Sequence, residues 1–267
     1  MPDQPGRPVE TLFGTDGVRG IAGEQITPEV MTELARAWPG PLTAEEPSPS
    51  VLMGRDTRVS GPELAAAMAD ELTRCGVEVV DCGIIPTGGL CLLVERRGAD
   101  GGVIISASHN PPEANGVKLV GRGGRKLAAE RLRRIEDVIR RASEPCATAE
   151  APPPRSAHPE VAEEYLAIIS EGLSPGCLGG LRVVLDCAHG AASEIAPDAF
   201  ERMGAKVTPL NCDADGARIN VDCGSTSPDA LARKVVMEGA DLGVAFDGDA
   251  DRAVFVDGEG GIVDGDG

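Results

Sequence analysis

Short apolar runs alternate with stretches of helical periodicity along most of this chain. Runs such as 51–53 (VLM) and 103–105 (VII) have the length and composition of buried strands. The segment between Ser60 and Gly76 carries apolar residues every three or four positions, which predicts a helix capped by the serine and ended by the glycine. Strands that alternate with helices of about 10 to 15 residues predict an α/β layered domain.

The same alternation resumes after a segment with the composition of a linker. Residues 143–156 (SEPCATAEAPPPRS) contain three consecutive prolines, which act as a semi-rigid spacer. Beyond them, helical periodicity over 159–170 precedes apolar runs at 181–185 and 242–246 that have the pattern of strands. We therefore predict two successive α/β domains with their boundary in this linker.

The overall charge of the chain narrows the classes of partner. A formal net charge of −18 argues against nucleic acids and anionic membranes, because either would be repelled over roughly a Debye length of about 8 Å. No apolar run approaches the ~20 residues that span a bilayer, and no basic segment followed by an apolar one marks an N-terminal signal. We expect a soluble cytoplasmic protein that binds neither nucleic acid nor membrane.

The cysteine pattern indicates buried thiols. None of the eight cysteines belongs to a Cys-x-x-Cys pair, and several lie inside apolar runs. They are Cys75, Cys82, Cys91, Cys146, Cys177, Cys187, Cys212 and Cys223. Dispersed buried thiols are therefore favoured over a zinc site or a disulfide framework.

A loop follows the apolar run at 103–105 and collects reactive side chains. The run stops at 106–110 (SASHN), and Pro111-Pro112 prevents a helix from continuing. A turn signal at Asn115-Gly116 then leads to a second strand that carries Lys118. Serine, histidine and lysine are thus brought close together, although these residues alone are equally consistent with an ordinary surface hairpin.

A glycine-rich segment near the N-terminus presents one arginine. Glycines punctuate residues 12–20 (LFGTDGVRG), where they permit tight turns and close backbone approach. The guanidinium of Arg19 is suited to bind an anion bidentately, and the alternative is an ordinary surface charge.

The most specific chemical signal is the segment 247–252 (DGDADR). Its three carboxylates stand at alternate positions of an extended segment, so they can converge on one cation. A calcium-binding helix-loop-helix also begins Asp-x-Asp-x-Asp, but its sixth position should be glycine and is Arg252, and its twelfth should be glutamate and is Gly258. Hard oxygen ligands with open positions favour Mg²⁺, and a solvated acidic turn is the remaining alternative.

Three motifs in this order resemble those of the α-D-phosphohexomutases. They are Phe13–Gly20 (FGTDGVRG), Ile105–Pro111 (ISASHNP) with Asn115–Lys118 (NGVK), and Asp247–Arg252 (DGDADR). The sequences of these motifs are most similar to those of the bacterial phosphoglucosamine mutase branch of that family. Three further segments share this similarity, 184–188 (VLDCA), 190–193 (GAAS) and 223–226 (CGST). The resemblance covers essentially all of residues 11–267, and one departure is His189, where the family usually has asparagine.

The resemblance implies two successive α/β/α layered domains, each with a mixed sheet between helices. Domain I would span residues 1–150 and carry the phosphoserine loop, and domain II would span 151–253 and end in the metal-binding loop. Residues 254–267 would begin domain III, and domain IV would be absent. In this family the third and fourth domains carry the loops that recognise the sugar and its non-reacting phosphate, so we expect little or no turnover by this chain alone.

The resemblance also assigns site residues. Ser108 would be the phosphoserine, and one Mg²⁺ per active site would be held by Ser108 together with Asp247, Asp249 and Asp251. The reacting centre would be lined by Arg19, His109 and Lys118, of which the last two are candidates for proton transfer, and Arg252 would orient the phosphoryl group.

The implied reaction interconverts glucosamine 6-phosphate and glucosamine 1-phosphate. Phosphoserine would give its phosphoryl group to the sugar, a sugar bisphosphate would turn over in the site, and the other phosphate would return to Ser108. A phosphosugar and a sugar bisphosphate are thus the expected partners. Phosphomannomutase or phosphoglucomutase activity, and a non-catalytic Mg²⁺-binding fragment, are the alternatives.

Overall fold

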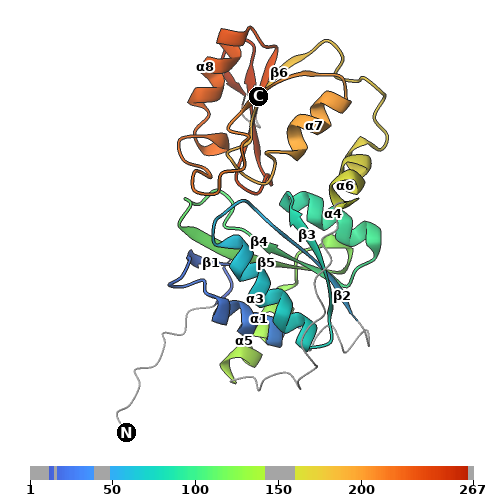
Figure 1. Ribbon diagram of the computed structural model, residues 1–267, viewed down its shortest axis with the longest axis vertical. Coiled ribbons are helices and arrows are strands. Elements are labelled where there is room, and N and C mark those ends of the chain that lie inside the picture. The colour runs from blue at the N-terminus through green and yellow to red at the C-terminus, as the bar shows by residue number, and fades with distance from the viewer. Residues whose placement is uncertain (1–11, 15–16, 39–48, 142–159, 264–267) are drawn as a thin grey trace.

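The computed structural model describes residues 12–14, 17–38, 49–141 and 160–263. These residues form two five-stranded mixed sheets, each covered by helices on both faces (Figure 1). The predicted class of two successive α/β/α domains is therefore confirmed. The linker at 143–156, where we predicted the domain boundary, lies outside the described residues.

The first sheet has the strand order β1-β5-β4-β2-β3. Its strands are β1 (Val18–Ile21), β2 (Ser50–Arg55), β3 (Glu78–Ile84), β4 (Gly101–Ile105) and β5 (Ala114–Gly121). Strand β2 pairs in parallel with β3 and β4, whereas β5 pairs antiparallel with β4 and β1. Because β2 and β4 are parallel, the loops that follow them leave the same edge of the sheet.

Helices pack on both faces of this sheet. They are α1 (Pro28–Ala37), α3 (Gly61–Arg74), α4 (Thr87–Arg97) and α5 (Ala129–Arg140), with a short 3₁₀ turn η1 (Arg122–Gly124). One core cluster joins α1, α3 and α5 to the inward side chains of β2, β4 and β5. The opposite face of the same strands packs on α4. Strand β4 is buried along its whole length, which explains its continuous apolar composition. Strand β5 is equally buried although it carries the polar Asn115 and the charged Lys118.

Helices α1 and α3 both begin where the sequence predicts, but only α1 has a side-chain capping bond. Thr27 caps α1 by accepting a bond from the backbone N–H of Val30, and Pro28 occupies the first turn. Ser60 occupies the predicted N-cap position of α3, but its side chain makes no capping bond. Its Oγ instead accepts a bond of 2.8 Å from Asn115 Nδ2, so a tertiary partner replaces the local one.

The second sheet has the order β10-β9-β8-β6-β7. Its strands are β6 (Arg182–Asp186), β7 (Lys206–Leu210), β8 (Leu242–Phe246), β9 (Ala253–Asp257) and β10 (Ile262–Val263). Its helices are α6 (Glu160–Ser170), α7 (Ile195–Arg202) and α8 (Asp229–Glu238), with a 3₁₀ turn η2 (Gly224–Thr226). The segment 253–263, predicted to begin a third domain at residue 254, extends this sheet instead, because β9 pairs antiparallel with β8 along its length.

The two domains share an apolar core. Leu90 and Leu93 of α4 belong to the same buried cluster as Leu166 of α6 and Ala199 of α7. Helix α6 lies between α4 and α7 in Figure 1, and it contacts both. Burial of these side chains favours the observed placement of the two domains relative to each other.

The described cysteines follow the prediction of buried free thiols only in part. Cys82, Cys187 and Cys223 are buried free thiols, whereas Cys177 is an exposed one. Cys75 is disulfide-bonded, so the prediction of free thiols was wrong for that residue. Among the described residues, no helix has the length and apolarity needed to cross a membrane.

Candidate functional site

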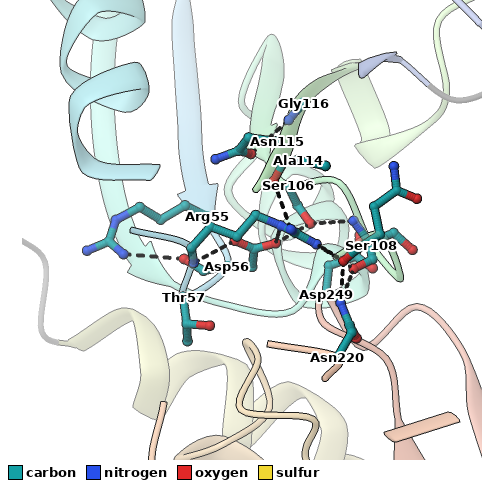
Figure 2. Close-up of polar contacts among 12 residues, drawn as sticks. Arg55, Asp56, Thr57, Ser106, Ser108, Ala114, Asn115, Gly116, Asn220 and Asp249 are labelled. Atoms are coloured by element: carbon teal, nitrogen blue, oxygen red, sulfur yellow. Dashed lines mark hydrogen bonds and ion pairs between the residues drawn. The ribbon is translucent and has the colours of Figure 1, made fainter. Parts of the chain in front are cut away.

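The loop after β4 holds a buried serine in an unusual backbone conformation. Ser108 has φ of 53°, in the left-handed region, and is only 2% exposed. Its backbone N–H donates a bond of 2.9 Å to Ser106 Oγ, and Ser106 Oγ donates one of 2.6 Å to Asp56 Oδ2. Figure 2 shows Ser106 and Ser108 in this arrangement beside Asp56. Ser106 thus links the loop backbone to Asp56, and the Ser108 hydroxyl points toward the second domain.

The segment after β8 brings three carboxylates to that hydroxyl. Ligand atoms of Asp247, Asp249 and Asp251 all lie within 4.8 Å of one another. Ser108 Oγ donates a bond of 2.7 Å to Asp247 Oδ2. Asp249 Oδ1 is buried and has no hydrogen-bond partner, and a buried carboxylate oxygen without a donor suits a cation ligand. The donor set therefore fits a hard divalent cation.

The charges of this cluster are strongly coupled. Burial, together with the neighbouring charge of Asp249, raises the pKa of Asp247 above its ordinary value. Burial also opposes ionisation of Asp249, but the ammonium of Lys118 outweighs it and holds the pKa of Asp249 below its usual range. Carboxylates packed this closely are stable as anions only when cations compensate them.

Two basic side chains provide that compensation. Lys118 Nζ, on β5, donates bonds of 2.7 Å to Asp249 Oδ2 and 2.9 Å to Asp251 Oδ2. Although burial lowers it, the pKa of Lys118 is raised overall by these two carboxylates, so the group is protonated. Arg252 Nη2 donates bonds of 2.7 Å to Asp247 Oδ2 and 3.1 Å to Ser108 Oγ.

An open pocket of about 340 Å³ lies beside the Ser108 hydroxyl. Its lining consists of Arg19, Ser108, His109, Asp251 and Arg252. Partial burial and the charges of Arg252 and Arg19 lower the pKa of His109, so its imidazole is neutral near pH 7. The pocket therefore offers two guanidinium groups and a neutral imidazole to an anionic ligand.

The structure brings together all eight predicted site residues. Five line the open pocket, and the others, Lys118, Asp247 and Asp249, contact one another or Ser108 directly. His189, the departure noted in the sequence, contributes no side chain to that pocket lining. Its Nδ1 pairs with Asp213, and its backbone carbonyl accepts a bond of 2.6 Å from Thr57 Oγ1 of the first domain.

Sequence reasoning missed the residues that support the serine loop. Asp56 and Arg58 lie just after β2, at the sheet edge from which the serine loop also leaves. Both are fully buried, and Arg58 donates to several carbonyls of that loop. The available signal was the segment 54–58 (GRDTR), which follows the apolar run at 51–53. Asn220, which also contacts the loop, lies in a polar segment with no comparable signal.

The chain matches two family descriptions of known proteins. Residues 10–145 match "Phosphoglucomutase/phosphomannomutase, alpha/beta/alpha domain I", and residues 163–261 match domain II of the same family. Among curated relatives, the chain is 44% identical over 256 residues to a phosphoglucosamine mutase of Thermoanaerobacter sp. (strain X514). It is also 44% identical over 257 residues to one of Clostridium tetani. Each alignment covers 96% of this chain and 57% of the relative.

Solved structures share the fold over nearly the whole chain. A phosphoglucomutase/phosphomannomutase family protein from Burkholderia thailandensis superposes with a TM-score of 0.81 at 28% identity, over 95% of this chain and 56% of that one. A putative phosphomannomutase from Thermus thermophilus gives a TM-score of 0.80 at 25% identity, over 94% and 57%. The chain thus spans little more than half the length of the relatives it matches.

Proposed function

Because the chain belongs to the phosphoglucomutase/phosphomannomutase family, we propose that it carries the phosphoryl-transfer centre of a phosphoglucosamine mutase, with Ser108 as the phosphoryl carrier. The observation that carries the proposal is the position of Ser108 Oγ at the pocket wall. This atom lies 2.7 Å from Asp247 Oδ2 and 3.1 Å from Arg252 Nη2. A carboxylate that holds the hydroxyl proton and a guanidinium that faces the same oxygen both assist transfer to a serine.

The basic residues of the pocket have complementary roles in this proposal. Arg19 and Arg252 face the pocket and bind the oxygens of the transferring phosphoryl group. The neutral imidazole of His109 accepts a proton from the attacking hydroxyl of the sugar. Lys118 is protonated between its two carboxylates, and the family resemblance makes it the second candidate for proton transfer.

Three aspartates are proposed to hold one Mg²⁺. Asp247, Asp249 and Asp251 supply its protein oxygens, together with an oxygen on phosphorylated Ser108. When bound, Mg²⁺ neutralises negative charge on the phosphoryl group. The partnerless oxygen of Asp249 supports this assignment.

The proposed substrates are sugar phosphates. The similarity to phosphoglucosamine mutases favours interconversion of glucosamine 6-phosphate and glucosamine 1-phosphate through a sugar bisphosphate. The described pocket lines only the reacting centre, so phosphomannomutase or phosphoglucomutase activity is the second candidate, supported by the family match. We place the domain boundary in the segment 143–156, between the two matched regions.

Intact-mass measurement tests the proposal directly. The purified chain is incubated with glucosamine 1,6-bisphosphate or glucose 1,6-bisphosphate and Mg²⁺, and the phosphorylated residue is located by peptide mapping. We expect one phosphate on Ser108, none in Ser108→Ala, and slower modification at Ser108 in Ser106→Ala. An unmodified Ser108 in the wild-type chain would favour the non-catalytic alternative.

Complete turnover is a separate part of the proposal. The chain covers 57% of the length of the curated relative from Thermoanaerobacter. In the α-D-phosphohexomutases, the third and fourth domains recognise the sugar and its non-reacting phosphate. We therefore expect a polypeptide of these 267 residues to accept the phosphoryl group but to show little steady-state mutase activity. A coupled assay at saturating glucosamine 6-phosphate measures this, and turnover close to that of the relatives would contradict it.

A further inference from the structure

Two side chains from different domains donate to the same two carbonyls of the serine loop. Arg58 Nη2 lies 3.0 Å from the Ser108 carbonyl oxygen and 2.7 Å from that of Asn110. Asn220 Nδ2 lies 2.9 Å and 3.0 Å from the same two oxygens. Figure 2 shows Asn220 approaching the Ser108 backbone from the second domain. We call Arg58 and Asn220 the carbonyl clamp.

Arg58 is itself rigidly held within the first domain. Its side chain is fully buried, and its Nε donates a bond of 3.0 Å to Asp56 Oδ2. Its Nη1 donates to the carbonyls of Pro111 and Ala114, the latter at 2.8 Å. One guanidinium thus contacts both ends of the loop. A buried cation with this many acceptors leaves the loop backbone little freedom.

Asn220 links the same carbonyls to the acidic segment of the second domain. Its backbone is left-handed, with φ of 61°, and its N–H donates a bond of 3.1 Å to the Ala188 carbonyl. The backbone of Gly248 packs against this contact, because a Cβ at that position would lie 2.7 Å from Ser108 O and 2.9 Å from Asn220 Nδ2. Asn220 and the acidic segment therefore belong to one unit in the second domain, whereas Arg58 is fixed in the first.

The clamp contacts the backbone next to the unfavourable φ angle of Ser108. A serine at φ of 53° is in a sparsely populated region, and it stays there only if its surroundings determine it. Bonds to the carbonyls on both sides of His109 fix the backbone that aims Ser108 Oγ at Asp247. We propose that Arg58 and Asn220 are positioning residues, and that Asn220 makes phosphoryl transfer to Ser108 depend on docking of the second domain. This inference rests on the proposed role of Ser108.

Asn220→Ala tests the inference with Asn211→Ala as its matched control. Asn211 also has a left-handed backbone, with φ of 52°, and its Nδ2 also donates a bond, but to Asp186 Oδ1 and not to the loop. Both substitutions therefore remove a donor and place alanine at positive φ. Only the first removes a contact with Ser108.

Two readouts are compared. Hydrogen exchange in peptides covering 106–112 should accelerate in Asn220→Ala and stay near wild type in Asn211→Ala. The single-turnover rate of Ser108 phosphorylation at saturating glucose 1,6-bisphosphate and Mg²⁺ should fall by about 10- to 100-fold only in Asn220→Ala. The half-saturating bisphosphate concentration should remain within about twofold, because positioning affects the reacting step more than binding.

A second variant separates shape from hydrogen bonding. Asn220→Asp keeps the size and the tolerance for positive φ but places an acceptor against two carbonyls, so it should slow phosphorylation at least as much as alanine does. Unchanged exchange and rate in both Asn220 variants, or equal losses in Asn211→Ala, would overturn the clamp. If the wild-type chain is not phosphorylated at all, the proposed function fails, and the exchange data still decide whether the clamp orders the loop.

Discussion

At the residue scale, the partnerless oxygen of Asp249 leads to a prediction about cation binding. Asp249→Asn removes one of three converging charges, so Mg²⁺ or Mn²⁺ affinity should fall by about tenfold or more. Isothermal titration calorimetry measures the affinity without any turnover. A cation that binds the folded state raises thermal stability, so the midpoint shift with Mg²⁺ should shrink in parallel.

Glu259→Gln is the charge-matched control for that variant. Glu259 is an exposed acid between β9 and β10, away from the three aspartates, and its loss changes the net charge equally. Its cation affinity should equal that of the wild-type chain. Equal affinities in Asp249→Asn and the wild type would show that the cation binds at another site. Equal losses of cation affinity in the two variants would indicate a general effect of net charge.

Also at this scale, burial predicts which thiols react. Desolvation raises the pKa of Cys82 and of Cys223 to about 12, so the thiolate is a negligible fraction of either at pH 8. Cys177 is exposed. Brief treatment with iodoacetamide at pH 8, followed by peptide mapping, should therefore modify Cys177 and spare the other two until denaturant is added. Early labelling of Cys223 in the native protein would contradict its assigned burial.

At the element scale, close packing of β5 against β1 leads to a prediction with an internal control. A Cβ on Gly116 would lie 2.5 Å from the Val18 carbonyl oxygen and 2.9 Å from that of Ser106, and neither backbone can easily yield. Gly116→Ala should thus lower the free energy of unfolding by about 1–3 kcal/mol. Gly88 lies in α4 with no neighbour within 4 Å, so Gly88→Ala should raise it by up to about 1 kcal/mol.

Urea titrations of the two glycine variants measure both the predicted decrease and the predicted increase in the free energy of unfolding. Gly116→Ala should also slow phosphorylation of Ser108, because β1 carries Arg19 and the Ser106 carbonyl begins the serine loop. Gly88→Ala adjoins Thr87, whose Oγ1 donates to Asp249 at 2.6 Å, and its phosphorylation rate should be unchanged. Destabilisation by both substitutions would mean that the β5 contact is not what distinguishes them.

The elements themselves were largely predictable because their signals are local. Periodicity and a threonine cap identified α1, and an apolar run identified β4. Ser60 was correctly placed at the start of α3, but its partner was not predicted, because its hydroxyl accepts from Asn115, which is 55 residues away. The clamp was missed for the same reason, since Arg58 and Asn220 meet the Ser108 carbonyl across 50 and 112 residues. Local patterns do not show which distant backbone a side chain will satisfy.

At the scale of the whole molecule, the shared core predicts that both domains unfold together. Leu93 is fully buried in the cluster that joins α4 to α6 and α7, so Leu93→Ala should lower stability by about 2–5 kcal/mol. Trp38, buried in the first domain, reports by fluorescence, and Cys187, buried in the second, reports by thiol labelling in urea. The two midpoints should coincide in the wild type and shift together in Leu93→Ala, whereas Val236→Ala at an exposed position of α8 should shift neither. Separate midpoints in the wild type would show that each domain folds alone, and docking would then be a later step.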